Sequence, residues 1–379
     1  MTFFHDIIDD VSRFLKNINL NELYISLFLR NLAGSIINIF VPVFLYQLGF
    51  SLGEIALFFL VSISFMLFLF PLGFFLATKI GVKHLMGIGT LLLLSFYLMM
   101  PSVEHGLFYL LPALIQAASF AFFWSGFHAR VTQSLSKNNA GSQLSLFQIV
   151  SILAMILGPL IGALFIFLLS FTFAFVMAAF LMLLSLVPLM LTKEYYLDKA
   201  LRLKDFLSHL TPKRLLGHIG EGIEDYTSVI LWPLFIFVVV QGVLSLGFIV
   251  SLSALPLVWY LWFVGKRVDA QPNKVLRLGV FSSSFITVLY PFILNPVGLF
   301  IMNFFNKVIN QTIFLSFQNI LYTQAKKSIS YIYFREVFLG LGRIIVLLVL
   351  FVSNSFFVTF FFAALGTLLC LCLVQKNRP

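Results

Sequence analysis

Three carboxylates open one apolar run of the chain and could exchange protons. Glu221, Glu224 and Asp225 lie at the start of residues 217–240. Carboxylates at a helix N-terminus are favoured by the helix dipole, by about 0.3–1 kcal/mol each, so all three could be structural. Alternatively, one of them takes up a proton, because a carboxylate removed from water holds its proton more tightly. Glu224 and Asp225 are the stronger candidates, since they lie deeper in the run than Glu221.

A lysine near the centre of another apolar run could bind a solute. Lys307 lies within residues 297–320, too deep to reach water easily. The helical spacing of Asn303, Lys307, Asn310 and Gln311 predicts a polar stripe near the middle of that helix. A charge inside a bilayer usually faces a helix bundle or a wet cavity. The stripe therefore indicates either a cavity that handles a substrate or ion, or a structural ion pair or hydrogen bond between helices.

Further polar side chains occur in two other runs. Arg30 and Asn38 share a face with Gly34, since the three are four residues apart. Arg30 either lines the cavity or has a structural partner, for which an acid of residues 217–240 is a candidate. Trp124 could stack on a substrate or lie at the membrane interface, and His128 could gate the site or contact lipid. We therefore place Arg30, Asn38, Trp124 and His128 among the candidate cavity residues.

Three charges in the run 329–352 favour a different role. Glu336 and Arg343 are seven residues apart, so they share a helix face but lie about 10 Å apart along the axis. Each is therefore expected to find its partner on another helix. Together with Arg335 they are predicted to be structural charges inside the membrane.

The elements that position these residues are long apolar helices. The chain has 379 residues, of which 61% are hydrophobic and 10% are charged, whereas soluble domains carry about 25% charged residues. Runs of about twenty apolar residues span a bilayer as helices. The sequence predicts an all-α integral membrane protein with twelve such helices, near 22–46, 52–77, 84–101, 107–130, 144–168, 171–192, 217–240, 244–264, 275–295, 297–320, 329–352 and 354–374.

The distribution of Lys and Arg predicts the orientation of these helices. Loops after even-numbered runs hold the basic residues, and loops after odd-numbered runs hold none. By the positive-inside rule both termini are cytoplasmic. The same distribution explains the net charge of +10 without nucleic acid. Residues 1–20 are predicted to be an amphipathic segment on the cytoplasmic surface, and residues 193–216 a basic central loop between two six-helix halves, 21–192 and 217–379.

The two halves resemble each other weakly. Ser51-Leu52-Gly53 with Ile55 opens the second run, and Ser245-Leu246-Gly247 with Ile249 opens the eighth. Polar residues are concentrated in every third run, the first, fourth, seventh and tenth. Two six-helix halves of this kind are typical of transporters.

On these grounds the chain resembles the major facilitator superfamily. In that family the first helix of each three-helix unit lines a central cavity and the third faces lipid. Residues 73–83 resemble the family's Gly-x-x-x-Asp-Arg-x-Gly-Arg-Arg signature without its acidic residue, and residues 265–269 keep Gly, basic residues and Asp. Residues 158–163 resemble the Gly-Pro-x-x-Gly-Gly element of family antiporters. The resemblance implies alternating access around a central site.

The sequence contains none of the short motifs of metalloproteases, P-loop proteins or serine hydrolases. We therefore expect no cofactor, no metal site and no enzyme activity. The predicted function is secondary active transport of a small solute by a monomer in the plasma membrane, surrounded by lipid, with proton coupling as a hypothesis. The alternative is a membrane enzyme that acts on a lipid-linked substrate.

Overall fold

A computed structural model describes residues 18–134, 140–197, 203–257, 259–260, 271–325 and 328–374. All regular structure within these ranges is helical. Ten stretches there are long and apolar enough to span a membrane, which confirms the class of the fold. Helix α15 (Pro296–Ala325) is 30 residues long but more polar, and the ten described residues of α12 (Val243–Leu252) are shorter than a bilayer requires. The total of twelve spans therefore remains a prediction.

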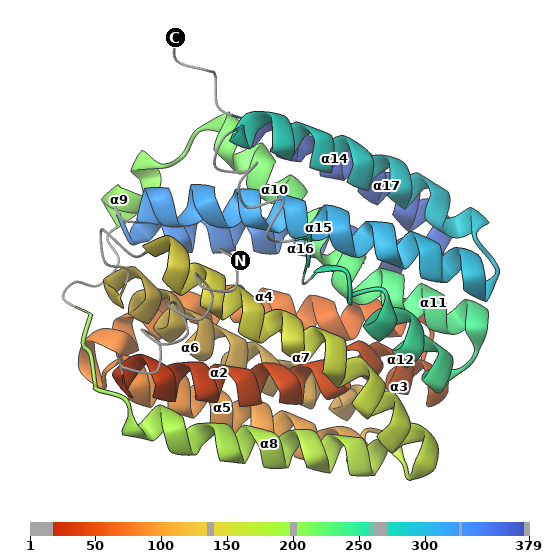
Figure 1. Ribbon diagram of the computed structural model, residues 1–379, viewed down its shortest axis with the longest axis horizontal. Coiled ribbons are helices and arrows are strands. Elements are labelled where there is room, and N and C mark those ends of the chain that lie inside the picture. Colours follow the sequence, from red (N-terminus) through yellow and green to blue (C-terminus); the bar gives the residue numbers. More distant parts are fainter. Residues whose placement is uncertain are drawn as a thin grey trace, which may run out of the picture.

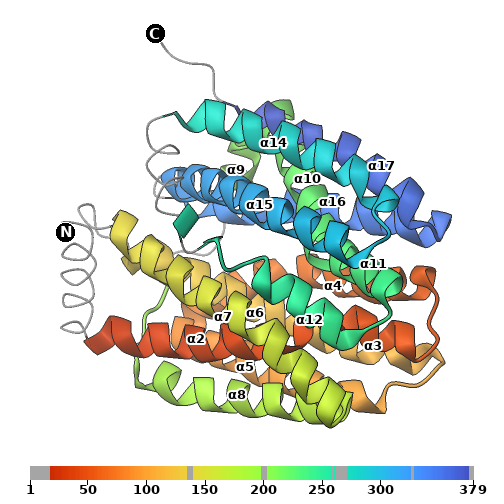
Figure 2. The same ribbon diagram turned by 45° about the vertical axis from the view of Figure 1, so that its right-hand side comes forward.

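The first group of helices contains the first six predicted runs (Figures 1 and 2). Its members are α2 (Ile18–Ile37), α3 (Val41–Gln47), α4 (Leu52–Lys79), α5 (Val82–Met99), α6 (Leu110–Ser134), α7 (Ala140–Leu168) and α8 (Phe171–Leu191). Helix α2 packs on α7 and α8, while α6 packs on α4 and α5.

The second group follows the short helix α9 (Leu203–Ser208). It contains α10 (Pro212–Tyr226), α11 (Trp232–Val240), α12, α14 (Pro272–Leu289), α15, α16 (Ser330–Ser353) and α17 (Phe356–Thr367). Helix α10 packs on α16 and α17, and α14 packs on α15 and α17. The boundaries at 192 and 217 stay a prediction. Helix α10 already begins at Pro212, within the segment predicted as a loop, because Thr211 caps it with a hydroxyl that accepts from the Arg214 N–H at 3.4 Å.

Two helices, one in each group, are interrupted before a proline. The 3₁₀ turn Asn38–Phe40 separates α2 from α3, ahead of Pro42, and the π turn Thr227–Leu231 separates α10 from α11, ahead of Pro233. Proline has no N–H to donate to the carbonyl four residues earlier, so the regular hydrogen-bond pattern fails there. Single π turns inside helices often occur at functional sites.

The two groups meet along two pairs of helices, α4 with α16 and α7 with α12. At one end the Gly53 N–H donates to the Asn354 side-chain oxygen at 2.9 Å. Farther along the same pair, the rings of Phe70 and Tyr333 stack with centroids 6.4 Å apart. We call the end at which α4 finishes and α5 begins the basic end, because Lys79, Lys83 and Lys193 lie there and it is predicted to face the cytoplasm.

Within the second group, α10 and α16 approach so closely that their contact requires glycine. A Cβ atom on Gly222 would collide with the carbonyl of Leu339, and one on Gly342 would collide with the carbonyl of Ile219. Small residues of this kind let two membrane helices bring their backbones together. The close approach places the carboxylates of α10 against the arginines of α16.

Helix α9 of the central loop docks on the basic end of α16. The Phe206 ring lies 5.2 Å from that of Tyr333 and 5.7 Å from that of Phe334, and the His209 ring lies 5.3 Å from that of Tyr331. Burial against α16, aided by the positive charge of Arg214, lowers the pKa of His209. The aromatic side chains of this segment are therefore packed against the protein, while its Leu207 and Leu210 remain exposed.

Mild acid is expected to release α9 from α16. Because the pKa of His209 is lower in the docked state than its ordinary value of about 6.5, docking is at full strength above that value and is lost as the pH falls through the lowered one. Hydrogen exchange over residues 203–210, corrected for the intrinsic effect of pH, should rise a few-fold between neutral and acidic pH. His209→Phe should remove this rise, and an equal rise in that variant would contradict the assignment.

The N-terminal residues 1–17, residues 265–269 and residues 198–202 of the central loop lie outside the described residues. The predicted amphipathic segment at 1–20 and the motif at 265–269 are therefore still predictions.

Candidate functional site

The charges of α10 and α16 form one buried cluster. Arg335 of α16 donates through Nε to a Glu221 carboxylate oxygen at 3.0 Å, and a second nitrogen of its guanidinium contacts the same oxygen. It also donates to Glu336 at 2.7 Å. All three side chains are buried, with at most 8% of each residue exposed. One guanidinium therefore neutralises parts of two carboxylates in a place that water does not reach.

Two histidines extend this cluster at its opposite ends. His218 lies 2.8 Å from the second Glu221 oxygen through Nδ1, and 3.0 Å from the Tyr331 hydroxyl through Nε2. His128 of α6 lies 4.0 Å from Glu336 through Nε2. We did not predict His218 and Tyr331 from the sequence. The contact between His218 and Glu221 could have been inferred from their spacing, since residues three apart on a helix are neighbours.

A second ion pair lies deeper along the same two helices. Arg343 donates through Nε to the Asp225 carboxylate at 2.8 Å. The side chains of this pair are less buried than those around Arg335, with Asp225 33% exposed. Arg335 and Arg343 thus pair with acids of α10, whereas Glu336 pairs with Arg335 of its own helix and not with another helix as expected. The structural role of these three charges stays a prediction.

Glu224 differs from its two neighbours. Its carboxylate accepts a hydrogen bond from the Ser228 hydroxyl at 3.2 Å, and in the described part of the chain no cation lies within ion-pairing distance of it. The residue is 8% exposed. An isolated charge is costly to bury without a partner of opposite charge. Of the three acids of α10, Glu224 is therefore the one whose charge no arginine compensates in the described part of the chain.

Arg30 lies inside the first group of helices. It donates to the Thr90 hydroxyl at 3.1 Å, and its guanidinium carbon stands 3.5 Å from the centre of the Phe123 ring. The proposed pairing with an acid of residues 217–240 is not found, since Glu221 and Asp225 pair with arginines of α16. Sequence spacing gives the face of a helix but not which neighbour covers it.

The other predicted cavity residues fall into two sets. Asn303 is 2% exposed, accepts from the Trp232 indole at 2.9 Å and donates to the Ile249 carbonyl at 3.3 Å, so protein partners occupy its amide. Asn38 accepts from the Tyr97 hydroxyl at 2.9 Å, and Gln311 is buried.

The second set contains Lys307, Asn310 and Trp124. Lys307 is partly buried, and within the described ranges no ion pair or hydrogen bond of its ammonium is found. Asn310, one turn away, has a buried side-chain oxygen for which the described residues provide no hydrogen-bond partner. Trp124 is 39% exposed, and its ring lies 5.7 Å from that of His128.

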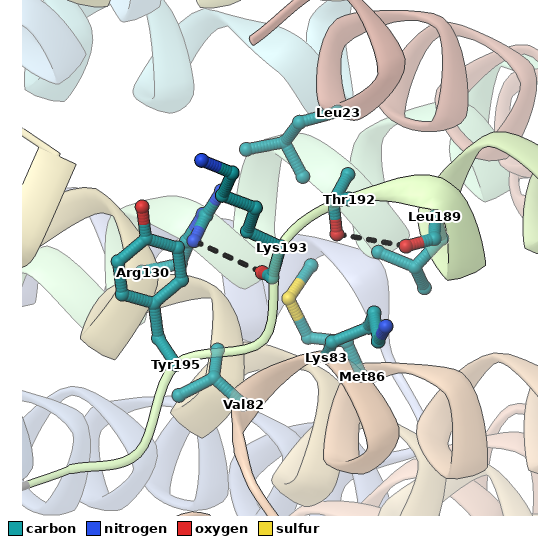
Figure 3. A pocket seen from close by; sticks show the side chains of 9 residues that line it. All are labelled: Leu23, Val82, Lys83, Met86, Arg130, Leu189, Thr192, Lys193 and Tyr195. Carbon is teal, nitrogen blue, oxygen red and sulfur yellow. Dashed lines mark hydrogen bonds between the residues drawn. The ribbon is translucent and has the colours of Figure 1, made fainter. Parts of the chain in front are cut away.

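A small cavity lies away from all of these residues, at the basic end of the first group (Figure 3). Its volume is about 10 Å³, which is room for a single water molecule. Arg130 lies there over the Tyr195 ring at 3.8 Å and donates to the Lys193 carbonyl at 3.3 Å. Glu194 accepts from the Lys83 N–H at 2.8 Å and so caps the start of α5. The cavity is a packing feature of this cap.

Among the described residues, no group of three or more histidine, cysteine, aspartate or glutamate side chains is arranged to hold a metal ion.

Comparisons with known structures identify the fold. A mutant of the nucleoside transporter NupG is 14% identical with a TM-score of 0.73, and the match covers 94% of this chain and 98% of that one. The human organic anion transporter MFSD10 (TETRAN) is 13% identical with a TM-score of 0.66, covering 94% and 99%. A POT family transporter in complex with 5-aminolevulinic acid is 10% identical with a TM-score of 0.70, covering 93% and 94%.

In a comparison with curated protein sequences nothing matches. The sequence model of the Major Facilitator Superfamily, however, matches residues 23–347, which is most of the chain. This match agrees with the apolar helices of the structure and with the fold of the three transporters. The chain is thus a multi-pass membrane protein of the transporter type and belongs to the Major Facilitator Superfamily.

Proposed function

We propose that this protein moves a small solute across the plasma membrane by alternating access and that protons drive the transport through Glu224. The observation that supports the coupling is the state of Glu224, a buried carboxylate whose one hydrogen bond in the described chain comes from Ser228. Its neighbours Glu221 and Asp225 already have cations. A proton is the smallest ion that could neutralise Glu224.

The moving parts are the two six-helix halves, residues 21–192 and 217–379, with both termini and the loop 193–216 in the cytoplasm. The separation of the helices into two groups supports this division, and so do the matching interruptions at Asn38–Phe40 and Thr227–Leu231. The protein acts as a monomer in lipid. Its transport cycle exposes a central site to one side of the membrane and then to the other.

Lys307, Asn310 and Trp124 supply the solute site. A cation, an unpartnered amide oxygen and an exposed indole together suit a small polar solute with an anionic or hydrogen-bonding group and a flat or apolar part. The named substrates of the structural neighbours, a nucleoside, an organic anion and 5-aminolevulinic acid, belong to this broad class. They define where a search for the solute should start.

The test is a thermal-shift screen of the purified protein against nucleosides, organic anions, amino acids, sugars and hydrophobic drugs. A ligand that binds the folded protein raises its melting temperature. The proposal predicts that one class of polar solute stabilises the wild type and stabilises Lys307→Met far less. Lys274→Met is the matched control, since Lys274 is exposed at the basic end of α14 and should leave the shift unchanged. Equal shifts in the wild type and in Lys307→Met would contradict this solute site.

A further inference from the structure

The cluster around Arg335 connects the two groups of helices through buried side chains. His218 and Glu221 belong to α10, Arg335 and Glu336 to α16, and His128 to α6 of the first group. The contacts run from His218 to Glu221, to Arg335, to Glu336, and across a gap of 4.0 Å to His128. Glu336 lies less than two turns from the start of α16, and His128 less than two turns from the end of α6. The connection is therefore at the basic end.

The charges of this cluster do not balance. Two carboxylates face one guanidinium, so the cluster carries one net negative charge when both histidines are neutral. A net charge in a place that excludes water is costly. The two imidazoles at its ends are the groups that can take up the balancing proton.

The surrounding charges do not supply that balance. Asp225 and Arg343, the next pair on these helices, neutralise each other. Glu224 on α10 adds only a further carboxyl. At the His218 end, Arg214 lies 5.7 Å from the Tyr331 ring and the His209 ring packs on the same tyrosine. Arg214 opposes a further positive charge at that end, and Arg335, which donates to Glu336, opposes one at the His128 end.

Hydrogen bonding also distinguishes the two histidines. Both ring nitrogens of His218 have hydrogen-bond partners when the imidazole is neutral. Nδ1–H then donates to Glu221, and Nε2 accepts from the Tyr331 hydroxyl. His128 is 5% exposed, its Nδ1 has no hydrogen-bond partner among the described residues, and its Nε2 is too far from Glu336 for a hydrogen bond. His128 is thus the imidazole that would gain a bond by becoming charged.

We propose that His128 and Glu336 form a proton-binding latch between the two halves, which closes the basic end when His128 is protonated. At a separation of 4.0 Å the imidazole and the carboxylate are not hydrogen-bonded. A charge-assisted hydrogen bond of about 2.7–2.9 Å would stabilise the imidazolium and draw α6 towards α16. The closed state therefore binds the proton more tightly than the open state, so acid favours closure by linkage.

This inference rests on the proposed alternating access, because it assumes that the halves move relative to each other. The latch differs in role from Glu224, which lies within the second group and touches Ser228 of its own helix. One site would carry the proton that drives transport. The other would make closing of the basic end depend on pH.

The experiment measures the distance between spin labels at Lys79→Cys on α4 and Lys213→Cys on α10, with Cys370 and Cys372 replaced by serine. Both lysines are exposed at the basic end, one in each group. On acidification from pH 8 to pH 5.5, the ratio of short to long distances should rise about tenfold, as one charge-assisted hydrogen bond would give. His128→Gln should abolish the rise, while His218→Gln and His105→Gln should keep it.

Three outcomes would overturn the latch: no change with pH in the parent protein, an unaltered change in His128→Gln, or its loss in His218→Gln with retention in His128→Gln. Solute flux through the same variants in proteoliposomes separates this result from the proposed function. A latch that responds to pH in a protein without flux would leave the latch standing and remove the transport proposal. Flux without a pH response of the distance would remove the latch and leave the transport proposal standing.

Discussion

Replacing Glu224 with glutamine is expected to abolish uphill accumulation of the solute, down to the level of vesicles without protein. The glutamine keeps the size of the side chain and its hydrogen bond with Ser228, but it cannot release or bind a proton. Exchange of solute across the membrane without a gradient should continue, because the protonated carboxyl and the amide are both neutral. The measurement is uptake into proteoliposomes with and without an imposed proton gradient.

Ser228→Ala is the matched control for this prediction. It removes the hydroxyl that donates to Glu224 and leaves the titrating carboxyl in place, so accumulation should persist. Asp225→Asn tests the alternative carboxylate and should weaken the protein through loss of the Arg343 pair. Accumulation by Glu224→Gln equal to that of the wild type would exclude Glu224 as the coupling residue.

The second large effect is expected from Arg335→Met. Removing the guanidinium leaves Glu221 and Glu336 buried without their cation, and breaking a buried ion pair in this way costs about 3–5 kcal/mol of stability. Arg343→Met should cost less, because its partner Asp225 is partly exposed and so keeps some contact with solvent. Reversible unfolding in mixed detergent measures both losses.

A triple variant makes this prediction specific to charge. Glu221→Gln and Glu336→Gln combined with Arg335→Met remove the two carboxylate charges together with the guanidinium. Most of the stability lost in Arg335→Met should return, since replacing an entire buried charge group by neutral residues is often close to neutral. A triple variant as unstable as Arg335→Met, or an Arg335→Met protein as stable as the wild type, would contradict the account.

The helices could be predicted from the sequence because apolar length alone selects them. Residues 52–77, for example, were expected as a span, and α4 covers Leu52–Lys79. The interruptions at Asn38–Phe40 and Thr227–Leu231 were not foreseen, although Pro42 and Pro233 were visible. A proline shows where a backbone hydrogen bond must be lost. Whether a 3₁₀ turn or a π turn forms there depends on packing.

The pairing of the buried charges could not be predicted for a similar reason. Spacing placed Arg30 on one face of its helix but did not say which helices cover that face. Arg30 is satisfied by Thr90 and Phe123, which are polar or aromatic rather than acidic. The close approach of α10 and α16, which brings Asp225 to Arg343, depends on Gly222 and Gly342 acting together across two distant segments.

Part of the candidate site could be predicted from the sequence. A helix with three charges in an apolar run requires partners, and each of the three charges of α16 has an ion pair. That their role is structural stays a prediction. Only the structure distinguishes Glu224 from Glu221 and Asp225, which each pair with an arginine. All three are acids on one helix, and their surroundings differ through the cations that reach Glu221 and Asp225.

Solute counterflow tests the central claim most directly. Proteoliposomes are preloaded with the solute that raises the melting temperature, diluted into a trace of labelled solute, and sampled over time without any ion gradient. A transporter that works by alternating access exchanges internal for external solute, so we predict a transient accumulation of label above its external concentration. Label that never exceeds the level of protein-free vesicles, with a solute that demonstrably binds, would contradict the account.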